Sequence, residues 1–283
     1  MKNSTLLQLQ RRPFGWTFDI PETFSNFEFE ELDYFYWHKL IQSNSKWAFY
    51  AGALYIVTIF GLQHYMKNKR ALELKRLLFL WNFFLGIFSI IGFWRTAPEF
   101  VYVISKPGGF FNSICVKSGT NVPLVFWTIV FAFSKFLELG DTLFIVLRKR
   151  PLIFLQWYHH LVTMIVVWVV APLVEPIVRW YVVLNYGVHS LMYPYFALRA
   201  GGVKVPHSFA NLITTLQLTQ MVVGFGVNVG SMLIQKSGYE CARYDSSIKA
   251  FAILYGSFLI LFGKLFYDSV LKSGRSRRKE KIL

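Results

Sequence analysis

Seven stretches of the chain consist mainly of apolar residues, and polar residues gather between them. The stretches cover residues 47–66, 75–95, 122–147, 151–171, 174–199, 205–235 and 248–270. A helix needs about 20 apolar residues to cross the hydrocarbon core of a bilayer. The pattern therefore predicts an all-α polytopic membrane protein with seven transmembrane helices.

The segment 100–117 interrupts this pattern. It is short, and it contains Pro107, Gly108 and Gly109, which disfavour a continuous helix. We therefore expect a loop here, either at the surface or re-entrant. The rest divides into an extracytosolic or interfacial N-terminal segment (1–46), a seven-helix domain (47–271) and a basic tail (272–283), with no separate soluble domain.

Composition agrees with a membrane location, and the charge pattern adds an orientation. Of 283 residues, 54% are hydrophobic and only 16% charged, whereas soluble domains carry about 25% charged residues. The formal net charge is +15. Lysine and arginine cluster after the first, third, fifth and seventh stretches, which lie on one side in this topology. Because basic loops stay cytosolic, we expect a cytosolic C-terminus and an extracytosolic N-terminus. Nothing outside the spans interleaves basic and aromatic residues as a nucleic-acid site does.

The two termini carry further signals. Residues 1–10 lack the apolar core of a cleavable signal peptide, so we expect none. Residues 14–44 are acidic and aromatic, and we expect them to lie on the membrane surface or to form a loosely ordered tail. Asn3 begins a glycosylation sequon on the extracytosolic side. Lys279 and Lys281 have the spacing of an endoplasmic reticulum retrieval signal, for which a solvated basic tail is the alternative.

Cys115 and Cys241 are the only two cysteines, and both fall in loops predicted to be extracytosolic. That side of a secretory membrane is oxidising, so a disulfide between them is expected, with two unrelated thiols as the alternative.

Ionisable residues inside apolar spans are costly and mark functional sites by default. Four spans carry them or polar residues at similar depth. Counting about 1.5 Å per residue from the cytosolic ends places Lys135 ~18 Å deep, Asp141 ~9 Å, His159 ~12 Å, His189 ~15 Å and Gln217 ~18 Å. Polar groups that pack helices together would not be expected to share one layer. The full set of candidates is Lys135, Glu138, Asp141, Gln156, His159, His160, Asn185, His189, Tyr193, Thr214, Gln217 and Gln220.

Spacing along each helix indicates which of these residues act together. Lys135 and Glu138 are three residues apart, so we expect them to pair on one helix face. Asn185, His189 and Tyr193 recur every four residues and form a stripe. A glutamine or threonine in a span is more often a contact between helices than a catalyst, but three histidines beside acidic residues point to chemistry.

The histidine count favours acid–base or nucleophilic catalysis over metal binding. Membrane di-iron oxygenases use many histidines, whereas only three lie at depth here, so we expect no metal and no cofactor. The cysteines lie on the wrong side to supply a thiol nucleophile. An imidazole is the best remaining nucleophile.

The motifs resemble those of the ELO family of very-long-chain fatty acid elongases. Lys135 to Thr142 reads K-x-x-E-x-x-D-T, and Gln156 to His160 reads like H-x-x-H-H with its first histidine replaced. Asn185-x-x-x-His189-x-x-Met192-Tyr193 and Thr214-x-x-Gln217-x-x-Gln220 follow in order. The resemblance covers the chain from about residue 47 to the end. The segment 147–155 is similar to the branch that acts on saturated and monounsaturated chains.

This resemblance implies an enzyme of the endoplasmic reticulum membrane that condenses a long-chain acyl-CoA with malonyl-CoA. The products are CO2, CoA and a 3-oxoacyl-CoA two carbons longer. The family fold has seven helices, six of which form a barrel around a tunnel for the acyl chain. The ketoreductase, dehydratase and enoyl reductase of the elongation cycle are the expected partners beside membrane lipid, and a homo-oligomer is left open.

The residues suggest roles within this reaction. Arg148, Lys149, Arg150 and Lys204 could pair with the CoA phosphates. His159 or His189 would attack the thioester to give an acyl-imidazole in a ping-pong reaction. His160, Asn185 and Gln217 would stabilise oxyanions, Lys135, Glu138 and Asp141 would orient the site, and Tyr193, Thr214 and Gln220 would contact substrate.

Gln156 is the departure from the family pattern. Glutamine keeps a donor and an acceptor but cannot transfer a proton. If the replaced histidine only orients its neighbours, activity survives, and we expect an active enzyme. The alternative from another class is a seven-helix receptor or transporter without catalytic activity, which a lack of any condensation product would favour. The sequence does not specify the acyl chain length or which histidine is acylated.

Overall fold

The computed structural model describes residues 25–117 and 121–272, and the order of helices follows the predicted spans. Each predicted span contains a helix with bounds within a few residues of the expected ones, except that α4 continues ten residues beyond 95 and the span 122–147 is divided into α6 and α7. The helices in chain order are α2 (Tyr34–Ser43), α3 (Trp47–Met66), α4 (Lys75–Ser105), α5 (Gly109–Cys115), α6 (Val122–Glu138), α7 (Gly140–Leu147), α8 (Phe154–Val170), α9 (Val178–Ala200), α10 (His207–Lys236) and α11 (Asp245–Phe266). Shorter helical turns are η1 (Glu28–Glu30), η2 (Ala171–Leu173) and η3 (Tyr267–Lys272).

The described part of the chain is helical or lies in turns and contains no β strand, as the pattern predicts. Five helical runs in it are long and apolar enough to cross a membrane, and the number is six if α2 and α3, bent by 57°, form one broken span. The five are Lys75–Ser105, Val122–Leu147, Phe154–Leu173, His207–Lys236 and Asp245–Lys272. Helix α9 is not among them, because it carries the polar stripe. The chain is thus a multi-pass membrane protein.

The prediction of a loop over 100–117 is wrong. Helix α4 continues through Pro98 to Ser105, and α5 covers most of the remainder. An internal proline costs one backbone hydrogen bond. The packing of the apolar residues 100–104 offsets this cost, so the helix continues. Gly108 separates the two helices with φ +69°, a left-handed conformation that glycine adopts without strain.

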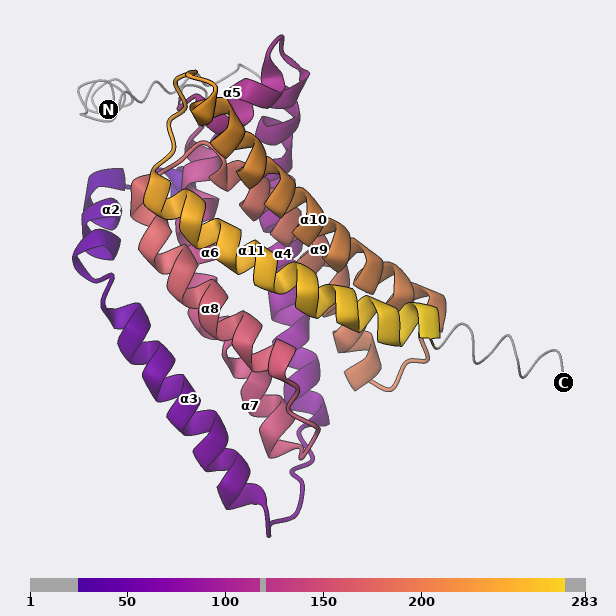
Figure 1. Cartoon of the computed structure of the whole chain (residues 1–283). Helices are drawn as coiled ribbons and strands as arrows, with labels where there is room; N and C mark the ends of the chain where they lie inside the picture. The colour runs from indigo at the N-terminus through magenta and orange to yellow at the C-terminus, as the bar shows by residue number, and fades with distance from the viewer. Residues whose placement is uncertain (1–24, 118–120, 273–283) are drawn as a thin grey trace, which may run out of the picture.

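Neighbouring helices pack in a defined order. Helix α4 lies against α9 and α6, α6 against α8, α8 against α11, α11 against α10, and α10 against α9. Helix α3 lies outside this group and contacts α7 and α8, as Figure 1 shows. The helices that carry polar residues are therefore brought together, with α3 at the periphery.

The N-terminal segment is attached to the helices through Glu30. Its carboxylate accepts hydrogen bonds from Arg95 Nε (2.8 Å) and Trp127 Nε1 (2.8 Å), and its side chain is fully buried. Helix α2 follows and packs on η2, where His38 Nε2 lies 2.7 Å from the Pro172 carbonyl oxygen. Residues 25–46 thus form an ordered element on the same side of the molecule as η2.

Candidate active site

A cavity of about 740 Å³ lies between α7, α8, α9 and α10, and most of the predicted site residues line it. We call it the polar cavity. The predicted residues in its wall are Asp141, Arg148, Arg150, Gln156, His159, His160, Asn185, His189, Tyr193, Thr214, Gln217 and Gln220. The polar layer inferred from helix depth therefore corresponds to one chamber.

Lys135 and Glu138 lie behind the wall of the polar cavity and support it. They form the expected pair, with Lys135 Nζ 2.7 Å from Glu138 Oε1, and both side chains are buried. Lys135 Nζ also donates to Asn185 Oδ1 (2.9 Å), and Asn185 Nδ2 lies 3.2 Å from His189 Nε2. A hydrogen-bonded chain thus runs from α6 to α9 and reaches the cavity at His189.

This chain determines the protonation of His189. An ammonium group can only donate, so the oxygen of Asn185 must face Lys135 and its NH2 must face His189. Nε2 of His189 therefore accepts, and the neutral ring carries its proton on Nδ1. Nδ1 lies 3.9 Å from Glu138 Oε1. The lone pair of His189 Nε2 is engaged by Asn185 in this state.

Asp141 is fixed by two aromatic residues from other helices. Trp81 Nε1 donates to Asp141 Oδ1 (2.6 Å), and the Tyr193 hydroxyl donates to Oδ2 (3.0 Å). The preceding residue, Gly140, allows this approach, because a Cβ there would lie 2.6 Å from Trp81 Cζ2. The break between α6 and α7 at Leu139 thus turns Asp141 toward the cavity.

Gln156 contacts one of the two α8 histidines. Its Nε2 lies 3.0 Å from His160 Nε2, which is also 3.7 Å from Asp141 Oδ2. The chain thus places an amide where the family pattern has an imidazole, within hydrogen-bond reach of His160.

His159 lies where the polar cavity meets a second one. The second cavity is about 50 Å³, and we call it the apolar cavity. His159, Asn185, Gln220 and Met221 line both. The His159 ring packs on Phe258 with centroids 4.6 Å apart, and its Nδ1 is buried without a hydrogen-bond partner among the described residues.

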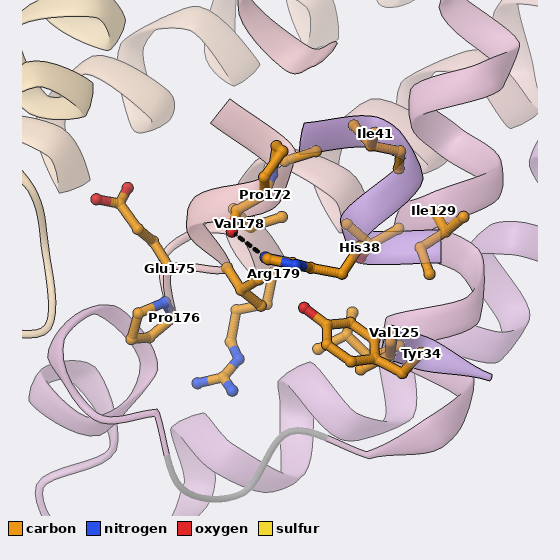
Figure 2. A pocket seen from close by; sticks show the side chains of 14 residues that line it. Tyr34, His38, Ile41, Val125, Ile129, Pro172, Glu175, Pro176, Val178 and Arg179 are labelled. Atoms are coloured by element: carbon orange, nitrogen blue, oxygen red, sulfur yellow. Dashed lines mark hydrogen bonds between the residues drawn. The ribbon is translucent and has the colours of Figure 1, made fainter. Parts of the chain in front are cut away.

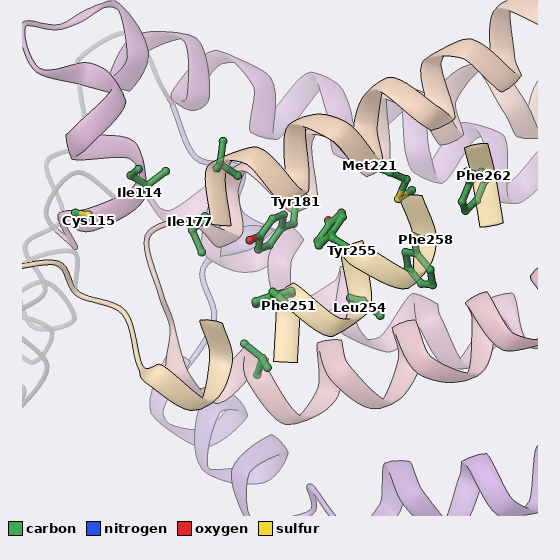
Figure 3. Close-up of a cluster of buried hydrophobic side chains, with 12 residues drawn as sticks. Ile114, Cys115, Ile177, Tyr181, Met221, Phe251, Leu254, Tyr255, Phe258 and Phe262 are labelled. Carbon is green, nitrogen blue, oxygen red and sulfur yellow. The ribbon is translucent and has the colours of Figure 1, made fainter. Parts of the chain in front are cut away.

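The apolar cavity leads from His159 toward η2, where Ala171 is part of its wall. Its remaining wall is mostly aliphatic and aromatic and includes Phe131, Tyr181, Phe251, Leu254, Tyr255 and Phe258. Figure 3 shows the side chains of Phe258, Tyr255, Phe251 and Tyr181 following one another beside α11. The Tyr181 and Phe251 rings are 4.4 Å apart. A polar chamber thus continues into an apolar path at His159.

Residues of α10 form the remaining polar wall. Gln217 Nε2 donates to Met192 Sδ (3.2 Å), and Thr214 Oγ1 donates to the carbonyl of Ala210 (3.1 Å). Gln220 is buried and faces both cavities. These contacts are compatible with substrate binding and with packing between helices.

Three arginines line the polar cavity, and they are not the set that the sequence suggested. Arg148 and Arg150 do so as expected, and Arg199 joins them from the end of α9. Lys149 and Lys204 do not line the cavity. Lys149 Nζ instead donates to the carbonyls of Lys67 (3.0 Å) and Lys69 (3.1 Å).

The site residues predicted from the sequence did not include Trp81 and Asn82 of α4. Trp81 orients Asp141, and Asn82 lines the polar cavity. Both lie in an otherwise ordinary apolar span, so no local pattern could single them out. Arg199 is a basic residue between two predicted spans. Its position after the polar stripe of α9 could have indicated that it lines the polar cavity.

Cys115 and Cys241 are joined by a disulfide that links α5 to the loop between α10 and α11. Asn3, Lys279 and Lys281 lie outside the described residues. The described residues contain no group of three or more potential metal ligands, and the expectation of a metal-free site remains a prediction.

Comparisons with known proteins identify relatives over most of the chain. The model of the ELO family, described as GNS1/SUR4, matches residues 40–278. The very long chain fatty acid elongase 6 of Drosophila melanogaster is 42% identical over 246 residues, covering 85% of this chain and 78% of the relative. The putative fatty acid elongase 3 of Caenorhabditis elegans is 43% identical over 223 residues, covering 78% and 70%. The very long chain fatty acid elongase 6 of Homo sapiens is 37% identical over 255 residues, covering 90% and 94%.

Proposed function

Since the chain belongs to the ELO (GNS1/SUR4) family and is thus a condensing enzyme of fatty acid elongation, we propose that it joins a long-chain acyl-CoA to malonyl-CoA. The products are CO2, CoA and a 3-oxoacyl-CoA two carbons longer. The observation that carries this proposal is the position of His159 in the wall shared by the polar and apolar cavities. A thioester placed there has its CoA in the polar cavity and its acyl chain in the apolar one.

The arginines favour CoA as the group that enters the polar cavity. Arg148, Arg150 and Arg199 line it, and guanidinium groups bind phosphate through paired hydrogen bonds. The acyl chain is then directed along Phe258 and Tyr255, where burial of methylenes contributes about 0.8 kcal/mol each. The two ends of the substrate thus have complementary surroundings.

In the first half-reaction, His159 attacks the thioester carbonyl. A C–N bond forms, the C–S bond breaks, and the CoA thiolate takes the imidazole proton and leaves as CoA. His159 is the better nucleophile because Nε2 of His189 already accepts from Asn185. His160, held by Gln156 with Asp141 nearby, can donate to the developing oxyanion.

In the second half-reaction, malonyl-CoA loses CO2, and its enolate attacks the acyl-imidazole. A C–C bond forms, the C–N bond breaks, and His159 regains a proton from solvent. Among the amides in the cavity wall, Asn185 and Gln217 would donate to the enolate oxygen. This chemistry uses imidazole and CoA thioesters and calls for no metal or cofactor.

The finer architecture is part of the proposal. The contacts α4–α6–α8–α11–α10–α9–α4 run from neighbour to neighbour and support a six-helix barrel, with α3 as the seventh, outer span. The disulfide and the arginines lie at opposite ends of the helices, which supports a lumenal N-terminus and a cytosolic C-terminus in the endoplasmic reticulum. The partner enzymes of the elongation cycle would then meet this protein in the same membrane.

The test uses full-length protein in nanodiscs with radiolabelled malonyl-CoA and acyl-CoAs of 12 to 22 carbons. We expect a labelled 3-oxoacyl-CoA and release of CO2. His159→Ala should abolish both, and His64→Ala, which changes an exposed histidine outside the polar cavity, should not. No condensation product at any chain length would contradict the proposal. The relatives reported above give no support to a receptor or transporter.

A further inference from the structure

A third cavity, of about 50 Å³, lies beyond the apolar cavity on the side of α2. We call it the α2 cavity. Tyr34, His38 and Ile41 of α2 form one wall, and Figure 2 shows these side chains facing Pro172 and Ile129. It is lined by more apolar than polar surface. It therefore suits a hydrocarbon group.

The apolar and α2 cavities share a wall of three small residues. Thr128 of α6, Ala171 of η2 and Val178 of α9 line both cavities. No large aromatic ring belongs to this shared wall among the described residues. The three cavities therefore follow one another from the arginines to α2, and a thin partition separates the last two.

Helix α2 is held firmly enough to act as an end wall. His38 Nε2 lies 2.7 Å from the Pro172 carbonyl oxygen, and Trp168 Nε1 donates to the Asn44 carbonyl (3.1 Å). Ile41 is 2% exposed and packs in a cluster with Ile129 and Trp168. These contacts attach the middle and the C-terminal end of α2 to the rest of the fold.

The charged residues at this cavity do not oppose a hydrocarbon. Glu175 pairs with Arg243, with Nε and Oε2 2.9 Å apart, and Arg179 pairs with Glu99, with Nη2 and Oε1 3.1 Å apart. Figure 2 shows the charged ends of Glu175 and Arg179 pointing away from Tyr34 and Ile41. Their charges are thus compensated outside the apolar part of the cavity.

We propose that the α2 cavity receives the methyl end of the longest acyl chains, with Thr128, Ala171 and Val178 as a partition and α2 as the end wall. This inference rests on the proposed function, since it needs an acyl chain that starts at His159.

Helix geometry gives the chain length at which the partition is reached. The twelve residues from His159 to Ala171 advance about 18 Å. An extended chain advances about 1.2 Å per single bond, so an acyl chain of roughly 14 to 16 carbons spans this path. The narrow apolar cavity requires rings such as Phe258 to turn as the chain enters. The α2 cavity, of about 50 Å³, has room for roughly three to five water-sized groups, at about 10–15 Å³ each.

The experiment compares condensation rates for acyl-CoAs of 14, 16, 18, 20 and 22 carbons in full-length protein. Val178→Ala thins the partition and should raise the rate with 20 carbons relative to 16 by about 16-fold, because two more methylenes are buried and each contributes about a factor of four. Val183→Ala is the matched control, a buried valine of the same helix that lines none of these cavities. Thr128→Ala is a second partition variant in case the first one folds poorly.

A double variant tests the part played by α2. Ile41→Phe fills the α2 cavity and should cancel the gain of Val178→Ala while condensation of the 14-carbon substrate persists. An unchanged chain-length profile in both partition variants, with 14 and 16 carbons still condensed, overturns the inference and leaves the proposed function intact. A gain that Ile41→Phe does not cancel overturns the assignment of α2. If the wild type condenses no substrate, the proposed function fails first.

Discussion

At the scale of single residues, the three histidines in the wall of the polar cavity have different surroundings. His160 lies beside Gln156 and Asp141, and His189 lies beside Asn185. His159 has an unpartnered Nδ1 among the described residues and touches Phe258. Because no neighbouring side chain is hydrogen-bonded to this nitrogen, the substrate alone can orient the His159 ring. We therefore propose His159 as the nucleophile.

Intact mass spectrometry can test this assignment. Protein treated with acyl-CoA alone should gain the mass of one acyl group, and the adduct should persist in His189→Ala but vanish in His159→Ala. Loss of the nucleophile should lower kcat at least about a thousandfold. An adduct that disappears in His189→Ala and persists in His159→Ala would transfer the role to His189.

Gln156 is expected to position His160 and not to transfer a proton. Gln156→Ala should lower kcat about 10- to 100-fold, because a hydrogen bond to a group that gains charge contributes about 1.5–3 kcal/mol. Gln156→His should keep most of the activity and add a limb near neutral pH to the rate profile, since imidazole titrates there. Steady-state kinetics from pH 5 to 9 provide the measurement. Full activity in Gln156→Ala would refute the positioning role.

At the scale of elements, Glu30 connects the N-terminal segment to α4 and α6. Burial alone would raise its pKa, but hydrogen bonds from Arg95, the Phe27 backbone and Trp127, with the charge of Arg95, lower the pKa below the ordinary 4.5. A lowered pKa means that the folded state favours the carboxylate. The attachment is therefore fully present above pH 4.5 and is lost as the pH falls through the lowered pKa.

Glu30→Gln should weaken the attachment of α2 by about 3 kcal/mol, because it leaves the Arg95 charge without its partner. In hydrogen exchange, residues 34–43 should lose protection at pH 7 in this variant. The wild type should lose protection there only on acidification below pH 4.5. Glu28→Gln, in the same short helix but exposed, is the control. Equal protection of α2 in both variants would show that Glu30 is not the anchor.

At the scale of the whole molecule, one covalent link joins α5 to the loop between α10 and α11. The Cys115–Cys241 disulfide spans 126 residues of sequence, and the Ala242 amide donates to the Cys115 carbonyl (2.9 Å). Nearby, Arg243 is buried among Glu175, Ser231 and Asn228. The ends of α5, α9, α10 and α11 are thus joined around this loop.

Cys115→Ser with Cys241→Ser should lower the thermal midpoint of the detergent-solubilised protein. A bridge that closes a loop of this length contributes about 4–5 kcal/mol in the loop-entropy model. Dithiothreitol should lower the midpoint of the wild type and leave the variant unchanged. Equal midpoints for the oxidised wild type and the variant would show that the link adds no stability.

Several features followed from sequence pattern alone because they depend on contacts within one helix. The positions of the spans follow from runs of apolar residues, and the Lys135–Glu138 pair follows from a spacing of three. The equal predicted depths of the polar groups rest on the constant rise of a helix, and most of these groups line one cavity. The length of α4 was underestimated because Pro98 and the glycines after it disfavour a helix in the sequence pattern. Packing stabilises the helix there.

The features that required the tertiary structure are contacts between helices. Such contacts depend on how each helix is rotated and packed, which the spacing of residues along one helix does not specify. Trp81 reaches Asp141 across 60 positions of sequence, and Lys135 reaches Asn185 across 50. The same packing turned Arg199 into the polar cavity, directed Lys149 away from it, and placed α2 in the wall of the α2 cavity. The sequence by itself determined which stretches form apolar helices and which polar residues they carry. The tertiary structure decided which of them face one another, because helix rotation and interhelical packing settle that choice.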